Sequence, residues 1–248
     1  MNEEEKMRQP KLPEFTSSMT KRELICALIW LPVHIIILPR IIGGLCAGGT
    51  VTEATANLLV YGISGIYIVV FEFSFLRRNF DPFCDNFLFC VLQIVVGYIA
   101  MMAMNMIASG TVSLFGRAFG AGAAIDNLNN DAIIDMAGEE RNTVSAMAIF
   151  VAPIVEEVIF RGGIFASLRK KNRTAAYAVS MLLFAVYHVW AYAAADPWYW
   201  IYLIQYLPAG YILCRCYERT NSIWTGIFFH MLTNGIALKA LEELGKML

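Results

Sequence analysis

Two adjacent glutamates and an arginine lie inside one apolar run of the chain, in the stretch Ala152-Pro-Ile-Val-Glu156-Glu157-Val-Ile-Phe-Arg161. Insertion scales assign each such charge a cost of about 2.5–3.5 kcal/mol near the centre of a membrane helix. Three charges within six residues therefore predict a buried functional site. The alternative is an ion cluster that only packs helices together.

Helical geometry gives the two glutamates different roles. Glu157 and Arg161 are i and i+4 with the acid on the N-terminal side, which is the favourable order for a pair on one helix face. Glu156 lies about 100° around the helix from Glu157. We therefore expect Arg161 to neutralise Glu157, and the carboxylate of Glu156 to stay uncommitted and act as a general base.

The chain has three histidines, and two of them fall within apolar segments near other polar or aromatic side chains at helical spacing. His188 follows Phe184 by four residues. His230 precedes Asn234 by four residues, so both side chains project from one helix face. These residues are expected to complete the site of Glu156. His34 has no such neighbour and is predicted to be structural.

The composition limits the class of protein that can present this site. Of 248 residues, 58% are hydrophobic and 16% are charged, with a net charge of −1; soluble domains are about 45–50% apolar and about 25% charged. These values exclude a disordered chain, a nucleic-acid binder and an ordinary cytosolic enzyme. They predict a multi-pass integral membrane protein whose partner is the lipid bilayer.

Seven apolar segments have the length of about 20 residues that a spanning helix needs, so the predicted fold class is an all-α, polytopic integral membrane helical bundle. β-Barrel strands would be short and alternating. The first segment contains Pro32 and Pro39 and carries Arg40, so we expect it to be kinked or split. The segments are 24–48, 55–76, 87–116, 143–168, 174–195, 197–214 and 222–238.

The segments divide the chain into four parts. Residues 1–23 form an N-terminal segment, 24–116 hold three transmembrane helices, 117–142 form an acidic, Gly-rich loop, and 143–248 form the core with the predicted site. If part of 117–142 re-enters the membrane, the bundle has eight helices.

The basic residues predict the orientation. Thirteen Lys and Arg residues fall at one end of the predicted helices and four at the other, which places the N-terminus in the cytoplasm by the positive-inside rule. Glu72, near a cytoplasmic helix end, is expected to snorkel. The depths of Glu156, His188 and His230 then predict one cavity reached from the cytoplasm.

The three motifs together identify a family. Glu156-Glu157-x-x-x-Arg161, Phe184-x-x-x-His188 and His230-x-x-x-Asn234, in this order on successive membrane helices, resemble the CPBP family. This is the CAAX-protease and bacteriocin-processing (Abi) group, which includes the type II CAAX prenyl endopeptidases. The resemblance covers about 143–238.

The resemblance implies an intramembrane endopeptidase of a bacterial plasma membrane. Glu156 and His188 would activate a water for attack on a peptide carbonyl, and His230 and Asn234 would donate hydrogen bonds to the oxyanion. Glu157 and Arg161 would support the site, together with Phe184. The substrate would be a membrane-associated peptide or protein, with or without a lipid group.

Two questions stay open at this point. Glu156, His188 and His230 also form a possible three-ligand zinc site; metal-free water activation is favoured, because Asn234 is a poor zinc ligand and a good oxyanion donor. The buried charges also fit a small proton-coupled transporter, or a catalytically silent immunity protein that binds a peptide. Cleavage of membrane-associated peptides separates these alternatives.

Overall fold

The structure is a computed structural model that describes residues 14–118 and 142–245. Within these two ranges every regular element is a helix and no strand occurs, which confirms the all-α class. Residues 119–141 of the predicted loop lie outside the described residues. The predicted alternative of an eighth helix falls on these residues and is therefore not addressed.

The first apolar segment is one uninterrupted helical run, Lys21–Ala47. It consists of α2 (Lys21–Pro32), a π-helical turn η1 (Val33–Ile37) and α3 (Leu38–Ala47). The run begins with a capping box between Thr20 and Glu23. Of the two predicted alternatives, a split does not occur, and the irregularity in the run is the π turn. Because Pro32 has no N–H to donate, the helix widens into the π turn that follows it.

The second segment is shorter than predicted. Helix α4 (Glu53–Phe71) ends before Glu72, and α5 (Phe73–Asp85) then turns along the end of the bundle before α6 (Phe87–Ala118) begins. The side chain of Glu72 is fully buried, and neither carboxylate oxygen has a hydrogen-bond partner among the described residues. The prediction that Glu72 snorkels was therefore wrong, because α5 covers this helix end.

The fourth segment forms the centre of the bundle. The run Asn142–Arg169 contains η2 (Met147–Val151), α8 (Ala152–Glu156), η3 (Glu157–Phe165) and α9 (Ala166–Arg169), of which η2 and η3 are π-helical. Its most apolar window is 56% buried, against 17–28% for the other candidate membrane spans. Burial on all sides is what allows this helix to carry charged residues.

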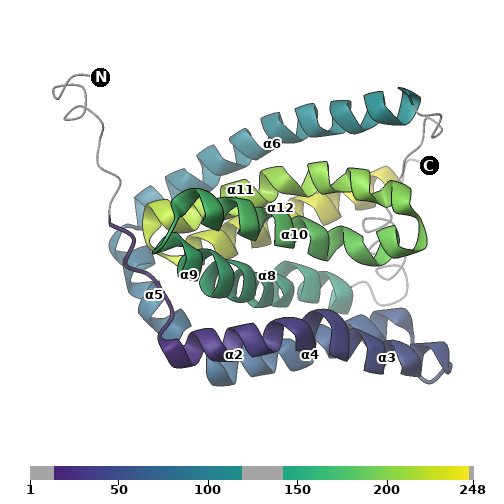
Figure 1. Cartoon of the computed structure of the whole chain (residues 1–248), viewed down its shortest axis with the longest axis horizontal. Coiled ribbons are helices and arrows are strands. Elements are labelled where there is room, and N and C mark those ends of the chain that lie inside the picture. Colours follow the sequence, from purple (N-terminus) through teal and green to yellow (C-terminus); the bar gives the residue numbers. More distant parts are fainter. Residues whose placement is uncertain (1–13, 119–141, 246–248) are drawn as a thin grey trace.

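The remaining helices enclose this central run. They are α10 (Arg173–Ala195), the 3-10 turn η4 (Pro197–Tyr202), α11 (Leu203–Thr220) and α12 (Ile223–Gly245). Figure 1 shows α6 on one side of the molecule, against α11 and α12, and α2–α4 on the other side. Helix α2 packs on η3, and α4 packs on α8.

Five described helical runs are long and apolar enough to cross a membrane: Lys21–Ala47, Glu53–Phe71, Phe87–Gly116, Asn142–Arg169 and Arg173–Ala195. The other two predicted segments are also helices, α11 and α12. Large apolar side chains such as Ile66, Leu88 and Met106 are exposed on the outer helices. Such a surface suits lipid contact, since the bilayer core accepts apolar side chains without cost.

Basic residues of α9 and α10 lie at one end of the bundle, beside the buried carboxylate of Glu218 on α11. Glu218 accepts hydrogen bonds from Arg169, Arg173 and Tyr177. Burial alone would raise the pKa of the Glu218 carboxyl, but these hydrogen bonds outweigh it and hold the pKa at about 2. Glu218 therefore ties α9, α10 and α11 together at this end.

Candidate active site

Glu156 ends α8 at the centre of the bundle and is 3% exposed. Its Oε1 accepts a hydrogen bond from the hydroxyl of Tyr61 at 2.8 Å. Its Oε2 has no hydrogen-bond partner among the described side chains. The prediction of an uncommitted carboxylate thus holds for one of the two oxygens. The π-helical stretch η3 begins at the next residue, and such irregular turns are frequent at functional sites.

Glu157 points away from Glu156 and forms the predicted pair with Arg161. Glu157 Oε1 lies 3.1 Å from Arg161 Nη1, and both side chains are completely buried. The guanidinium of Arg161 also stacks 4.2 Å over the ring of Phe184. A buried ion pair with an aromatic neighbour fixes the face of the helix that carries it.

His188, on α10, is oriented by the backbone one turn earlier. Its Nδ1 donates to the carbonyl oxygen of Phe184 at 2.9 Å. A carbonyl oxygen only accepts, so Nδ1 carries the hydrogen, and Nε2 of the neutral ring keeps a lone pair. This Nε2 lies 3.8 Å from Glu156 Oε2.

His230, on α12, is oriented by the second glutamate. Its Nδ1 lies 3.0 Å from Glu157 Oε1, and its Nε2 lies 3.9 Å from Glu156 Oε2. Asn234, one turn later, lines the same cavity and donates one amide hydrogen to the carbonyl oxygen of Ala148 at 2.9 Å. Its second amide hydrogen remains available for a ligand.

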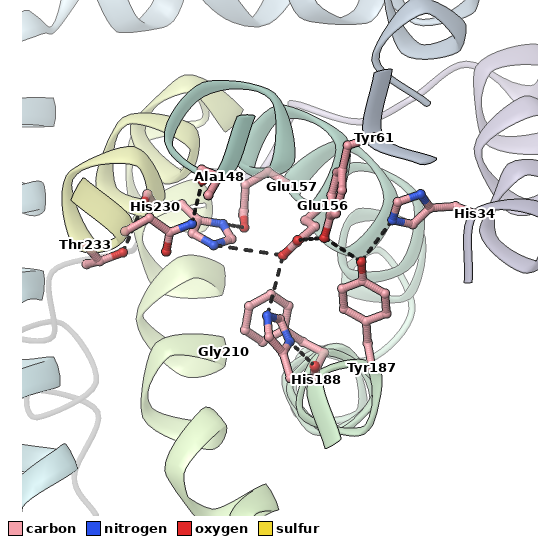
Figure 2. Close-up of polar contacts among 12 residues, drawn as sticks. His34, Tyr61, Ala148, Glu156, Glu157, Tyr187, His188, Gly210, His230 and Thr233 are labelled. Carbon is pink, nitrogen blue, oxygen red and sulfur yellow. Dashed lines mark hydrogen bonds and ion pairs between the residues drawn. The ribbon is translucent and has the colours of Figure 1, made fainter. Parts of the chain in front are cut away.

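The helices thus bring all seven predicted residues together. Figure 2 shows the ring of His188 on one side of the Glu156 carboxylate and the ring of His230 on another. A water that donates to Glu156 Oε2 and to His188 Nε2 fits the 3.8 Å between them, since contacts of this length are commonly bridged by water. The arrangement suits proton abstraction from a nucleophilic water.

Three residues that the sequence did not place in the site are also there. The hydroxyl of Tyr61 lies 2.7 Å from that of Tyr187, and Nε2 of His34 lies 3.0 Å from the Tyr187 hydroxyl. His34 thus contacts the site through Tyr187, although the sequence shows no partner for it at helical spacing. The sequence shows a histidine and several tyrosines inside apolar segments. It does not indicate which tyrosine the histidine contacts.

The site lies at the inner end of a cavity of about 490 Å³. Its lining is mostly apolar, and the residues that line it beyond Glu156 come from one end of the bundle, among them Ile42, Gly43, Ala56, Val144 and Leu238. This end carries the α3–α4 turn and lies opposite the end with Glu218 and the basic residues. The cavity extends from Glu156 toward the end of the bundle opposite the basic residues. The expectation of access from the side of the N-terminus was therefore wrong.

The zinc alternative was tested against the donor set. Among the described residues, no group of three or more His, Cys, Asp or Glu side chains is placed to hold a metal ion. One oxygen of Glu156 is already engaged by Tyr61, and Nδ1 of each histidine is bonded elsewhere, which leaves Glu156 Oε2 and the two Nε2 atoms as the donors that a metal ion would use. The zinc alternative stays a prediction, and no step is derived through a metal.

Comparison with known proteins supports the resemblance inferred from the motifs. Residues 141–236 match the family model described as "Type II CAAX prenyl endopeptidase Rce1-like". This stretch contains all seven predicted site residues, and the predicted resemblance is thereby confirmed. Tyr61 and His34 lie outside it.

Two curated proteins are similar to parts of the chain. One is "Putative membrane peptidase YdiL" of Bacillus subtilis (strain 168), 30% identical over 151 residues, which are 60% of this chain and 56% of that protein. The other is "UPF0177 protein YxdF" of Lactococcus lactis subsp. lactis (strain IL1403), 31% identical over 101 residues, 40% of this chain and 51% of that protein. The similarity thus spans about half the length of each relative. No solved structure matches the chain.

Proposed function

We propose that this membrane protein, with its Rce1-like stretch 141–236, is an intramembrane endopeptidase that hydrolyses a peptide bond with a Glu156-activated water. The observation that carries the proposal is the convergence of Glu156 Oε2 with the Nε2 atoms of His188 and His230, at 3.8 and 3.9 Å, at the end of a largely apolar cavity. The favoured mechanism is metal-free.

In the first step the water loses a proton to Glu156 as its oxygen attacks the scissile carbonyl carbon. His188 Nε2 accepts a hydrogen bond from the other O–H of the same water, whose hydrogen stays on the oxygen, and this contact orients the oxygen lone pair toward the carbon. The π electrons of the carbonyl move to its oxygen, and a tetrahedral oxyanion forms. In the second step the oxyanion re-forms the C=O bond as the C–N bond breaks, and the leaving nitrogen keeps the C–N electron pair and takes the proton back from Glu156.

The oxyanion would be stabilised from α12. Because His230 Nδ1 donates to Glu157, its Nε2 can donate to the oxyanion only when the ring is doubly protonated. The second amide hydrogen of Asn234 provides the other donor. Donors aimed at a developing oxyanion in a water-excluded site are worth several kcal/mol.

The apolar lining favours a substrate that arrives through the membrane. Charged side chains of a substrate would lose their hydration in this cavity without gaining partners, so we propose a membrane-associated peptide with apolar residues around the scissile bond. The orientation with a cytoplasmic N-terminus is part of this proposal and rests on the distribution of basic residues.

Peptide cleavage in liposomes tests the proposed function. Wild type and Glu156→Gln are compared on internally quenched peptides that carry, or lack, a farnesylated cysteine. We expect wild type to cut at least one peptide, and Glu156→Gln to lower kcat by about 10²–10⁴-fold. Glu53→Gln, the same change at an exposed position, is the control and should not alter kcat. Ion or solute flux without cleavage would favour a transporter, and peptide binding with neither would favour an immunity protein.

A further inference from the structure

A line of hydrogen bonds leads from Glu156 into the N-terminal helices. Tyr61 donates to Glu156 Oε1 at 2.8 Å, the Tyr61 and Tyr187 hydroxyls are 2.7 Å apart, and His34 Nε2 follows at 3.0 Å. Figure 2 shows these side chains in sequence from the carboxylate to His34. We call Tyr61, Tyr187 and His34 the tyrosine–histidine line. The proposed reaction does not use it.

The far end of the line is closed by the backbone. His34 Nδ1 lies 2.8 Å from the Ser64 hydroxyl, and this hydroxyl donates to the carbonyl oxygen of Val60 at 2.8 Å. His34 is 1% exposed and Ser64 is fully buried. A histidine buried in a bundle would be costly if its nitrogens were unpaired; here both ring nitrogens have a partner.

The donors in the line are linked to one another. Since Ser64 gives its single hydrogen to Val60, its oxygen must accept from His34, so Nδ1 carries a hydrogen. When Glu156 is ionised, Tyr61 donates to it, Tyr187 donates to Tyr61, and the line is complete only if His34 Nε2 donates as well. When Glu156 is protonated, every donor can reverse and His34 Nε2 accepts. The protonation of His34 is thus tied to that of Glu156.

The line also restrains the geometry of the general base. A glutamate side chain has several rotatable bonds, and a base must be held close to its productive position. The hydroxyl of Tyr61 holds Oε1, and the hydrogen bond from Tyr187 turns the hydrogen of Tyr61 toward Glu156. Oε2 is then the oxygen left to face His188 and His230.

We infer that Tyr61, Tyr187 and His34 act as one positioning unit, which fixes the Oε1 side of Glu156 and couples its protonation to that of His34. The inference rests on the proposed function for its effect on turnover. It assigns to the two N-terminal helices, which lie outside the Rce1-like stretch, a direct part in the site.

Turnover of the farnesylated reporter peptide gives the first test. Tyr61→Phe should lower kcat about tenfold or more with KM nearly unchanged, as supporting hydrogen bonds to reacting groups do in other sites. Tyr187→Phe should lower kcat less. The double variant should be no worse than Tyr61→Phe alone, because one break already disconnects the line. Tyr67→Phe removes a hydroxyl hydrogen bond on the same helix and should leave kcat unchanged.

Multiplicative losses in the double variant, or an effect on KM alone, would show that the two hydroxyls act separately and overturn the inference. A kcat for Tyr61→Phe within about twofold of wild type would do the same, since breaking a supporting contact should cost more. Unfolding temperatures of all variants establish that each one folds.

Nitrogen-15 spectra of the histidines give a test that needs no peptidase activity. The chain has three histidines, so His34 is assigned by substituting the other two. Glu156→Gln should shift the His34 ring signals, although the two residues share no hydrogen bond. The same substitution in a Tyr61→Phe background should lose most of this shift. An unchanged His34 signal overturns the inference, whereas a coupled signal without cleavage of any peptide overturns only the proposed function.

Discussion

His230 and Glu157 are joined by a 3.0 Å contact between Nδ1 and Oε1, and this contact separates the tasks of the two adjacent glutamates. Glu156 faces the cavity, while Glu157 holds a histidine from another helix in place. The Arg161–Glu157 pair, predicted as a local helix interaction, therefore also determines how α12 presents His230.

Removing the charge of Glu157 should damage both stability and activity. Glu157→Gln leaves the buried guanidinium of Arg161 without a counter-charge, which typically costs about 3–5 kcal/mol. A double variant, Glu157→Gln/Arg161→Met, should recover much of the stability and none of the activity, because His230 still lacks its partner. Denaturant unfolding and peptide cleavage measure the two effects. Recovered activity in the double variant would contradict this role of Glu157.

A larger side chain beside Glu157 should also lower activity. A Cβ added at Gly226 would lie 3.2 Å from Glu157 Oε2, and Glu157 cannot retreat without losing Arg161 or His230. Gly226→Ala should therefore lower kcat several-fold. Gly235→Ala, on the same helix, meets only the end of Ile149 at 3.9 Å and serves as the matched control. Equal kcat values for the two variants would argue against a strained Glu157.

Chelation should leave cleavage intact. The proposed mechanism uses Glu156 and His188 without an ion, so exhaustive treatment with a zinc chelator should not change kcat on the reporter peptide. Parallel analysis of the purified protein should find no stoichiometric zinc. Loss of activity that added zinc restores would replace the water-activation proposal by the zinc alternative.

The Glu218 cluster predicts a loss of stability in acid. Its folded pKa of about 2 lies below the ordinary value for Glu of about 4.3, so ionised Glu218 stabilises the fold above about pH 4 and loses this effect as pH falls toward 2. The unfolding temperature of wild type should exceed that of Glu218→Gln at pH 5 and approach it near pH 2. A difference that does not depend on pH would mean that Glu218 acts through packing alone.

The direction of the cavity predicts from which side of the membrane a thiol reagent reaches a cysteine in its lining. Gly43 lines the cavity, and Cys84 is exposed on α5 at the other end of the bundle. In variants with a single cysteine, Gly43→Cys and Cys84 should react with a membrane-impermeant maleimide from opposite sides of sealed vesicles. The positive-inside rule places Cys84 on the cytoplasmic side. Reaction of both from one side would contradict the cavity direction.

The sequence was sufficient where the information is local. The seven helical segments follow from hydrophobicity, and the relations between Glu157 and Arg161, Phe184 and His188, and His230 and Asn234 follow from helical spacing. The order of these motifs also identified the family that residues 141–236 match.

The rest depends on how distant helices pack. Tyr61 and Glu156, which form a hydrogen bond, are 95 residues apart in the sequence, and His34 and Tyr187 are 153 residues apart. The sequence does not show whether a tyrosine in an apolar helix only packs against its neighbours or also donates a hydrogen bond. The burial of Glu72 and the direction of the cavity depend on α5 and on helix tilt, which hydrophobic patterns do not encode.

The buried position of the central run Asn142–Arg169 has a consequence for how the protein is made. A helix that carries Glu156, Glu157 and Arg161 is a poor substrate for membrane insertion on its own, since three charges outweigh much of its apolar content. The helices Lys21–Ala47 and Glu53–Phe71 are synthesised before it and supply Tyr61 and the packing surface of η3. The preceding helices thus offer the buried surface on which the charged helix can pack once both are in the membrane.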